Sequence, residues 1–209
     1  MTLRVEPVIG GGSSTPANPQ GMLIVSPGVA ADWTWVNQGV ATTEDVDGGI
    51  RLIGVDEAAA FDYHMLVKGG VPATNWKATI GLRYAMKYDA TFPMFGLIAR
   101  ESGTGKFIDF SFAQFPGIAL QYQAFDSPVA RNSVVFATPA SQLIAAPVYL
   151  QIEDDGVNLN WRISQDGRSF VTWRSSARAA FCVPDQYGFG ICDYGAFAML
   201  NVFHAQLET

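Results

Sequence analysis

Apolar and polar residues alternate with a period of two along most of the chain after Met22. The longest run spans residues 76–88, where every even-numbered residue is apolar while Lys77, Thr79 and Arg83 occupy odd positions. A helix would scatter these apolar side chains around its whole circumference, whereas a strand collects them on one face. The pattern therefore predicts a long β-strand with one buried and one solvated face.

The same alternation returns in two further pairs of segments. Residues 148–153 and 157–163 flank Asp154-Asp155-Gly156, and residues 108–112 and 118–123 flank Phe115-Pro116-Gly117. Both connecting sequences are typical of hairpin turns. Along the whole chain the pattern predicts about twelve to fourteen strands and no helix of three turns. We expect one all-β domain over residues 22–209.

Residues 1–21 have a different composition. An apolar start, with Leu3, Val5, Val8 and Ile9, precedes a stretch rich in glycine, serine and proline. Such a stretch predicts a flexible N-terminal arm or linker. Two interpretations are open: the arm is a disordered tail, or its apolar tip docks on a neighbouring subunit. In the second case Leu3, Val5, Val8 and Ile9 are interface residues.

The last predicted strand, over residues 196–207, is apolar on both faces. Leu200 and Val202 share one face. The other face carries larger side chains, namely Phe197, Met199, Phe203 and Leu207. Such a strand is either a central strand that the chain's own loops cover or an interface strand. In the second case we expect Phe197, Met199 and Phe203 to contact a partner.

Composition narrows the possible partners. Of the 209 residues only 15% are charged, 49% are hydrophobic and the net charge is −6. The scarcity of charge excludes disorder and coiled coil, and the acidic balance argues against nucleic acid or anionic membranes as partners. No apolar run is long enough to span a membrane, and the N-terminus lacks the apolar core of a Sec signal.

The residues that most often carry chemistry are sparse. For Cys182 and Cys192 we favour two buried free thiols, because a disulfide between them requires a bulge or a rotated strand. The absence of any CxxC pair argues against a cysteine zinc site. His64 and His204 lie among apolar neighbours in predicted strands, so we interpret both as structural. We therefore predict no catalytic residue, no metal and no cofactor.

The acidic clusters at residues 44–47 and 153–155 each end at glycine. We interpret both as solvated turns; an acid/base pair or a set of calcium ligands is the alternative. Asp166-Gly167 lies in a segment that resembles a single sialidase Asp-box. This pair predicts a tight turn in which the aspartate accepts hydrogen bonds from backbone amides, so we assign it a role in folding.

Residues 147–156, 159–170 and 188–191, together with Trp33–Gly39 and Gly96–Arg100, resemble the concanavalin A-like lectin/glucanase superfamily. The resemblance covers residues 22–208. It implies a jelly-roll β-sandwich of two antiparallel sheets, with sugar binding often on the concave face or its edge loops. The Glu-x-Asp-x-x-Glu strand of the glucanase branch is absent, so the resemblance does not extend to catalysis.

The polar sides of the predicted strands provide candidate sugar-binding residues independently. Hydroxyl, amide and guanidinium groups on a curved sheet hydrogen-bond sugar hydroxyls. The candidates are Arg83, Gln121, Gln123, Asn160 and Arg162, and their polar neighbours Thr79, Asp109, Ser111 and Asn158 face the same way. The alternative interpretation is an ordinary solvated outer face.

A short arm joined to one jelly-roll domain with few charges and no Sec signal is common among bacteriophage virion proteins. This analogy of fold leads us to expect a noncatalytic structural component of a capsid, tail or fibre. Its partners would be other virion subunits or further copies of itself. A carbohydrate-binding module acting in glycan adhesion is the alternative, and a glycoside hydrolase comes third.

Overall fold

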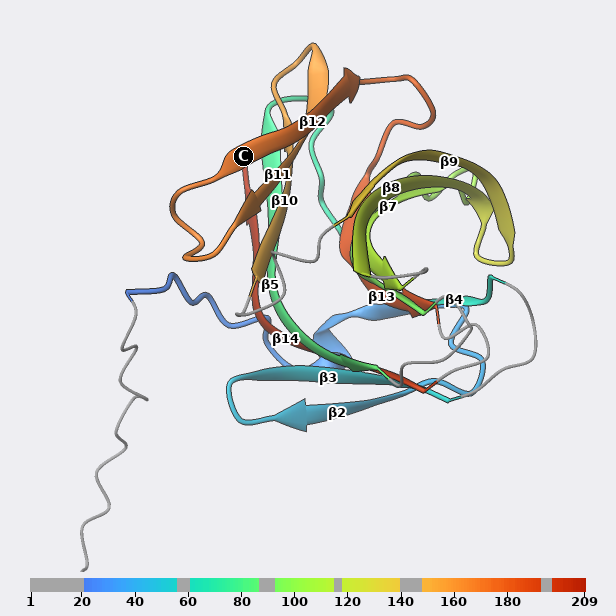
Figure 1. The fold of residues 1–209 in the computed structure, drawn as a ribbon, viewed down its shortest axis with the longest axis vertical. Helices are drawn as coiled ribbons and strands as arrows, with labels where there is room; N and C mark the ends of the chain where they lie inside the picture. Colours follow the sequence, from blue (N-terminus) through green and yellow to red (C-terminus); the bar gives the residue numbers. More distant parts are fainter. Residues whose placement is uncertain (1–20, 56–60, 87–92, 115–117, 140–147, 193–196) are drawn as a thin grey trace, which may run out of the picture.

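The computed structural model describes residues 21–55, 61–86, 93–114, 118–139, 148–192 and 197–209, which form two seven-stranded antiparallel sheets (Figure 1). Sheet A has the order β1 (Thr34–Val36), β4 (Tyr63–Gly69), β13 (Gln186–Cys192), β6 (Met94–Arg100), β7 (Phe107–Gln114), β8 (Ile118–Ser127) and β9 (Ala130–Pro139). Sheet B has the order β12 (Val171–Ala177), β11 (Asn158–Ser164), β10 (Val148–Asp154), β5 (Trp76–Met86), β14 (Ala198–Glu208), β3 (Gly49–Gly54) and β2 (Thr42–Val46).

The predicted all-β sandwich of two antiparallel sheets is confirmed. Within the described residues the one helix is a three-residue 3₁₀ turn, Ala30–Asp32. The predicted long strand is β5, in which Trp76, Ala78, Ile80 and Leu82 are buried. Strands β10 and β11 pair antiparallel on either side of residues 155–157, as the turn sequence predicts.

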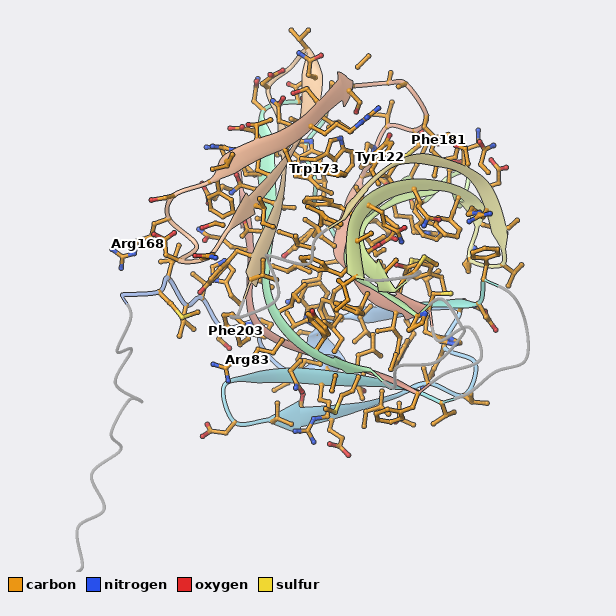
Figure 2. The ribbon with its side chains drawn as sticks, in the orientation of Figure 1. Arg83, Tyr122, Arg168, Trp173, Phe181 and Phe203 are labelled. Atoms are coloured by element: carbon orange, nitrogen blue, oxygen red, sulfur yellow. The ribbon has the colours of Figure 1, made fainter. Side chains whose placement is uncertain are left out.

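The main core lies between the sheets and is rich in aromatic rings. Trp161 of sheet B packs against Tyr122 and Phe110 of sheet A, with ring centroids 4.5 and 5.6 Å apart. Trp173 of β12 stacks on Phe110, and Figure 2 shows Trp173 and Tyr122 near each other where β12 meets sheet A. These rings hold the β12 end of sheet B against sheet A.

Sheet A curls so strongly that its inner face encloses a second core (Figure 1). Three glycines on that face allow neighbouring strands to approach closely. A Cβ at Gly188 would lie 2.0 Å from the Leu66 carbonyl oxygen, and one at Gly96 would lie 2.2 Å from that of Phe110. Any larger residue would therefore force the strands apart. The curl depends on glycine at these positions.

Aromatic rings fill the enclosed space. The ring of Tyr63 lies 5.3 Å from the rings of both Phe107 and Phe125, which stack on each other at 4.6 Å. Met94, Ile98 and further buried side chains pack around these rings. The inner face of sheet A is consequently closed by its own side chains.

Strand β14 is a central strand, between β5 and β3. Leu200 and Val202 face the main core as predicted, but the expected orientation of Leu207 is wrong. A β-bulge between Val202 and His204 reverses the alternation, so Leu207 packs against the same core. The sequence alternation alone does not reveal where a strand takes an extra residue.

Candidate functional site

The outer face of sheet B carries most of the accessible residues that the sequence singles out. Cross-strand pairing arranges this face in rows that run across β11, β10, β5 and β14. The first two rows are polar, and we call them the polar rows. They consist of Asn160, Glu153, Lys77 and Glu208, followed by Arg162, Gln151, Thr79 and Gln206.

The middle of the polar rows forms a connected network of hydrogen bonds and ion pairs. Arg162 Nη1 donates to Glu153 Oε2 at 2.9 Å and to Gln151 Oε1 at 3.1 Å, and Gln151 Nε2 donates to Thr79 Oγ1 at 2.9 Å. Lys77 Nζ lies 3.4 Å from the other Glu153 oxygen. Two polar atoms, Arg162 Nε and Gln206 Oε1, have no hydrogen-bond partner within the described residues.

Phe170 adds an aromatic surface beside this network. The Arg162 guanidinium lies over the Phe170 ring, 5.6 Å from its centroid. At this distance the negative face of the ring attracts the guanidinium and helps to hold it in place. Arg162 therefore combines charge, amide neighbours and a flat apolar surface at one position.

The next row, Tyr149, Gly81 and His204, is crossed by the chain's own residues 22–25, which we call the strap. The backbone N–H of Leu23 donates to the Asp166 carbonyl at 2.9 Å, and the Tyr149 hydroxyl donates to the Leu23 carbonyl at 2.6 Å. The backbone N–H of Val25 donates to His204 Nδ1 at 2.9 Å, and the Ala205 N–H donates to the Val25 carbonyl at 3.1 Å.

Two glycines make room for the aromatic rings below the strap. A Cβ at Gly81 would lie 2.8 Å from Tyr149 and 2.7 Å from Phe203, and one at Gly167 would lie 2.7 Å from Tyr149. Gly167 also has a φ of +74°, which disfavours other residues. Glycine at both positions keeps Tyr149 in place to donate to the strap.

The turn that receives the strap follows the sequence prediction. Asp166 Oδ1 accepts hydrogen bonds of 2.8 Å from the backbone amides of Arg168 and Ser169, and the Ser164 hydroxyl donates to it at 2.8 Å. These donors lower the pKa of Asp166 to about 2, because each favours the charged carboxylate. The predicted tight turn, in which Asp166 accepts hydrogen bonds from backbone amides, is confirmed.

His204 is fully buried and has a structural contact, as the sequence predicts. Burial lowers its pKa to about 4, because the charged imidazolium loses its hydration. The ring is therefore neutral near pH 7 and offers Nδ1 as an acceptor to the strap. Nε2 has no hydrogen-bond partner within the described residues.

A polar row with Arg83, Asn201, Arg51 and Glu44 separates the strap from two apolar rows. Met199 of β14 pairs with Ile53 of β3 and with Ala85 of β5. Phe197 and Val55 lie just beyond the paired residues Ala198 and Gly54, and their side chains are 43% and 44% exposed. We call these residues, Ile53, Val55, Ala85, Phe197 and Met199, the apolar patch.

The predicted sugar-binding residues do not form one site. Arg83, Asn160 and Arg162 lie on the outer face of sheet B, whereas Gln121 and Gln123 lie on the inner face of sheet A and are only 5% and 3% exposed. The sequence assigns each residue to the correct side of its strand. It does not show that the curl of sheet A buries the polar side of β7 and β8 as well.

Asp109 lies beside the two glutamines and is completely buried. The Ser111 hydroxyl donates a hydrogen bond to Oδ2, while Oδ1 has no hydrogen-bond partner within the described residues. Burial raises the pKa of Asp109 to about 7, and the Ser111 hydrogen bond opposes part of this shift. A carboxyl in this closed position has no route to a large substrate.

The predicted interface residues fall into two groups. Phe197 and Met199 belong to the apolar patch. Phe203 lies under Arg83, with its ring centroid 5.7 Å from the guanidinium carbon. Figure 2 shows the two residues side by side. The arm residues Leu3, Val5, Val8 and Ile9 lie outside the described residues, so their contacts stay a prediction. The sequence pattern does not predict the strap. The one signal in the sequence is Gly81, because a glycine inside a long alternating strand often marks a place where another group approaches the backbone closely.

The prediction of solvated turns is wrong for most of the acidic residues, because cross-strand pairing extends through both clusters. Glu44 and Asp45 belong to β2, and Glu153 and the buried Asp154 belong to β10, while Asp47 and Asp155 lie in the connections after these strands. Asp155 Oδ1 accepts from the amides of Val157 and Asn158, and Asp154 pairs with Arg178. Within the described ranges no three His, Cys, Asp or Glu residues are grouped to hold a metal ion. Cys182 and Cys192 are both buried thiols, as predicted. No helix in the described part of the chain is long and apolar enough to cross a membrane.

Comparisons of sequence find neither a matching family model nor a matching curated protein. Solved structures do share the fold. A functionally unknown protein from Saccharomyces cerevisiae superposes with a TM-score of 0.63 at 15% identity, over 86% of this chain and 97% of that one. The carbohydrate-binding module CBM66 from Bacillus subtilis superposes with a TM-score of 0.53 at 14% identity, over 90% of this chain and 100% of the module.

The GH43 protein BlXynB from Bacillus licheniformis superposes with a TM-score of 0.58 at 11% identity, over 84% of this chain. This chain covers 36% of that protein. Identities this low establish fold and nothing finer. The chain therefore shares with these solved structures the fold of a two-sheet antiparallel β-sandwich.

Proposed function

We propose that this protein is a noncatalytic structural subunit that assembles through the outer face of sheet B. The observation that carries the proposal is the apolar patch on three adjacent strands. The exposed side chains of Phe197 and Val55 extend beyond the half-buried Met199 and Ile53. Contiguous exposed apolar residues with a polar border are typical of protein interfaces.

The border of the patch suits such a contact. Arg51 Nη1 bonds to Glu44 at 2.9 Å and Arg51 Nε donates to Asn201 at 3.0 Å, so the flanking row is already ordered. Fully burying a large apolar side chain contributes about 1.5–3 kcal/mol. The patch thus supplies the attraction, and the polar row limits how a partner docks.

The carboxylates favour a noncatalytic role over a glycoside hydrolase. Glu153 is bound by both Arg162 and Lys77, and Asp109 is enclosed in the second core. Glycosidases need two accessible carboxyl groups facing one cleft, and Glu153 and Asp109 do not supply such a pair.

The particle that we propose for this subunit is a bacteriophage virion, with a capsid, tail or fibre position. The support is the combination of a glycine-rich arm, one sandwich domain and few charges. Mass spectrometry of particles purified from infected cells tests this assignment. A protein absent from the particles, yet abundant in the infected cells, would contradict it.

The assembly itself is tested by light scattering after size-exclusion chromatography over a range of concentrations. Phe197→Ser and Met199→Ser should each raise the dissociation constant about tenfold or more. Val157→Ser is a matched control, because Val157 is 72% exposed in the turn between β10 and β11, away from the patch. A monomer at every concentration would overturn the proposal.

A carbohydrate-binding module is the second candidate, and the polar rows favour it. They offer amide, ammonium and guanidinium groups beside the Phe170 ring, which resembles the mixture that sugar sites use. Binding on a glycan array that Arg162→Ala and Lys77→Ala abolish would support this function. Arg131→Ala on β9 is the control, and equal loss with that variant would contradict a site at the polar rows.

A further inference from the structure

The strap is held on sheet B in a manner that any copy of the chain can reproduce. Its hydrogen bonds involve the backbone of Leu23 and Val25 and are made to a fixed set of groups, which we call the strap seat. The seat consists of Tyr149, Asp166, His204 and Ala205. Because the seat recognises backbone atoms of an extended segment, it is a receptor for a short extended peptide.

We propose that the strap exchanges between copies, so that residues 22–25 of one subunit occupy the strap seat of its neighbour. This inference rests on the proposed assembly and names the contact that locks it. An exchanged strap makes the same four hydrogen bonds as one that folds back on its own subunit. Exchange of an identical element therefore costs little at equilibrium and depends on protein concentration.

Two of the four strap side chains contribute little to its attachment. Ile24 is 54% exposed and Val25 is 37% exposed, whereas Met22 and Leu23 are half-buried. The backbone hydrogen bonds and the half-buried contacts of the strap all re-form when another copy supplies the segment. An element held mainly by such hydrogen bonds opens more readily than one buried in a core.

A firm anchor immediately after the strap provides the hinge. The Pro27 carbonyl accepts hydrogen bonds from Trp33 Nε1 at 3.1 Å and from Lys68 Nζ at 3.3 Å. Pro27 is buried, and Gly28 has a φ of +84°. The chain is thus fixed at Pro27, and Ser26 is the exposed position at which the strap can change direction.

The position of the seat favours exchange at the proposed interface. The seat and the apolar patch lie on the same face of sheet B, separated by the one row that contains Arg83, Asn201 and Arg51. Subunits that meet through their patches therefore bring strap and seat of different copies close together.

Isotope mixing with a photo-crosslinker tests the exchange. The full chain carries p-benzoylphenylalanine at Val25, whose backbone and not its side chain binds the seat. Equal amounts of ¹⁵N-labelled and unlabelled protein are mixed, concentrated, irradiated and separated by size. In the oligomer fraction, mixed-isotope peptides, which join a heavy strap to a light seat or a light strap to a heavy seat, should together make up about half of the strap–seat crosslinks. The same crosslinker at the exposed Val157 gives the background.

The outcomes separate the two proposals. An oligomer in which every strap–seat crosslink joins peptides of the same isotope would overturn exchange and leave the proposed assembly intact. A protein that light scattering shows to be monomeric at all concentrations would overturn both. Hybrid crosslinks that survive in Phe197→Ser would show that the strap, without the patch, holds copies together.

Discussion

The backbone N–H of Val25 donates a 2.9 Å hydrogen bond to Nδ1 of His204, 179 positions later in the chain. This bond requires a neutral imidazole, because a protonated Nδ1 has no lone pair to accept it. The attachment of the strap is therefore linked to the protonation of one buried histidine.

His204 should make stability fall on acidification. Its folded pKa of about 4 lies below the ordinary value of 6.5, so the unfolded chain binds the proton more tightly. The contribution is complete above pH 6.5 and is lost as the pH falls toward 4, by up to about 3 kcal/mol. Denaturant unfolding of wild type and His204→Phe across this range measures it. A wild-type loss that the variant retains would refute the assignment to His204.

Asp109 should act with the opposite sign in an overlapping pH range. Its folded pKa of about 7 exceeds the ordinary 3.8, so stability is highest below pH 4 and falls as the pH rises through 7. Asp109→Asn should therefore stabilise the protein at pH 8 on the order of 1–3 kcal/mol, and have little effect at pH 4. Urea unfolding at the two pH values measures the difference. Equal effects at both would contradict a buried titrating carboxyl.

The curl of sheet A should depend on Gly188. An alanine there places Cβ 2.0 Å from the Leu66 carbonyl oxygen, so Gly188→Ala should destabilise the fold by about 3 kcal/mol or more. Gly69→Ala is the matched control, since Gly69 lies in the adjacent strand β4 with no atom within 4 Å of the added Cβ. Thermal unfolding compares them. Similar melting temperatures would show that the sheet relaxes easily.

The Tyr149 hydroxyl should contribute to holding the strap. Tyr149→Phe removes the donor to the Leu23 carbonyl and should cost about 1 kcal/mol, with faster hydrogen exchange at the Val25 amide. Tyr84→Phe is a suitable comparison, because the buried Tyr84 hydroxyl has no hydrogen-bond partner within the described residues. That change should be neutral or stabilising. Protection of the Val25 amide that is unchanged in Tyr149→Phe would argue against this contact.

Local features of the fold could be predicted from the sequence because neighbouring residues determine them. The alternation in β5 sets which face is buried, and Asp166-Gly167 forms its turn from its own side chain and the next two amides. The interpretation of Cys182 and His204 as buried structural residues is also confirmed. Each of these inferences uses an interaction within one or two strands.

The rest depends on contacts between distant segments. From their own strand, Gln121 and Gln123 are expected on a solvated face. They are buried because Gly188 of β13 and Gly96 of β6 allow the sheet to curl over them. The strap joins Leu23 to residues more than 120 positions away. Of the candidate site, the sequence identified Phe197, Met199, Asn160 and Arg162, but no periodic pattern encodes their arrangement around a peptide from the other end of the chain.

Because sheet A closes on itself, the two sheets do not offer equal surfaces to other molecules. The inner face of sheet A is filled by its own side chains, so the outer face of sheet B is the main surface on which a ligand or partner can bind. Glycans at the polar rows and subunits at the apolar patch would bind to neighbouring halves of the same sheet face, and the strap lies between the two halves. A partner bound at the apolar patch would then change the accessibility of the polar rows, and a glycan bound at the polar rows would change that of the patch.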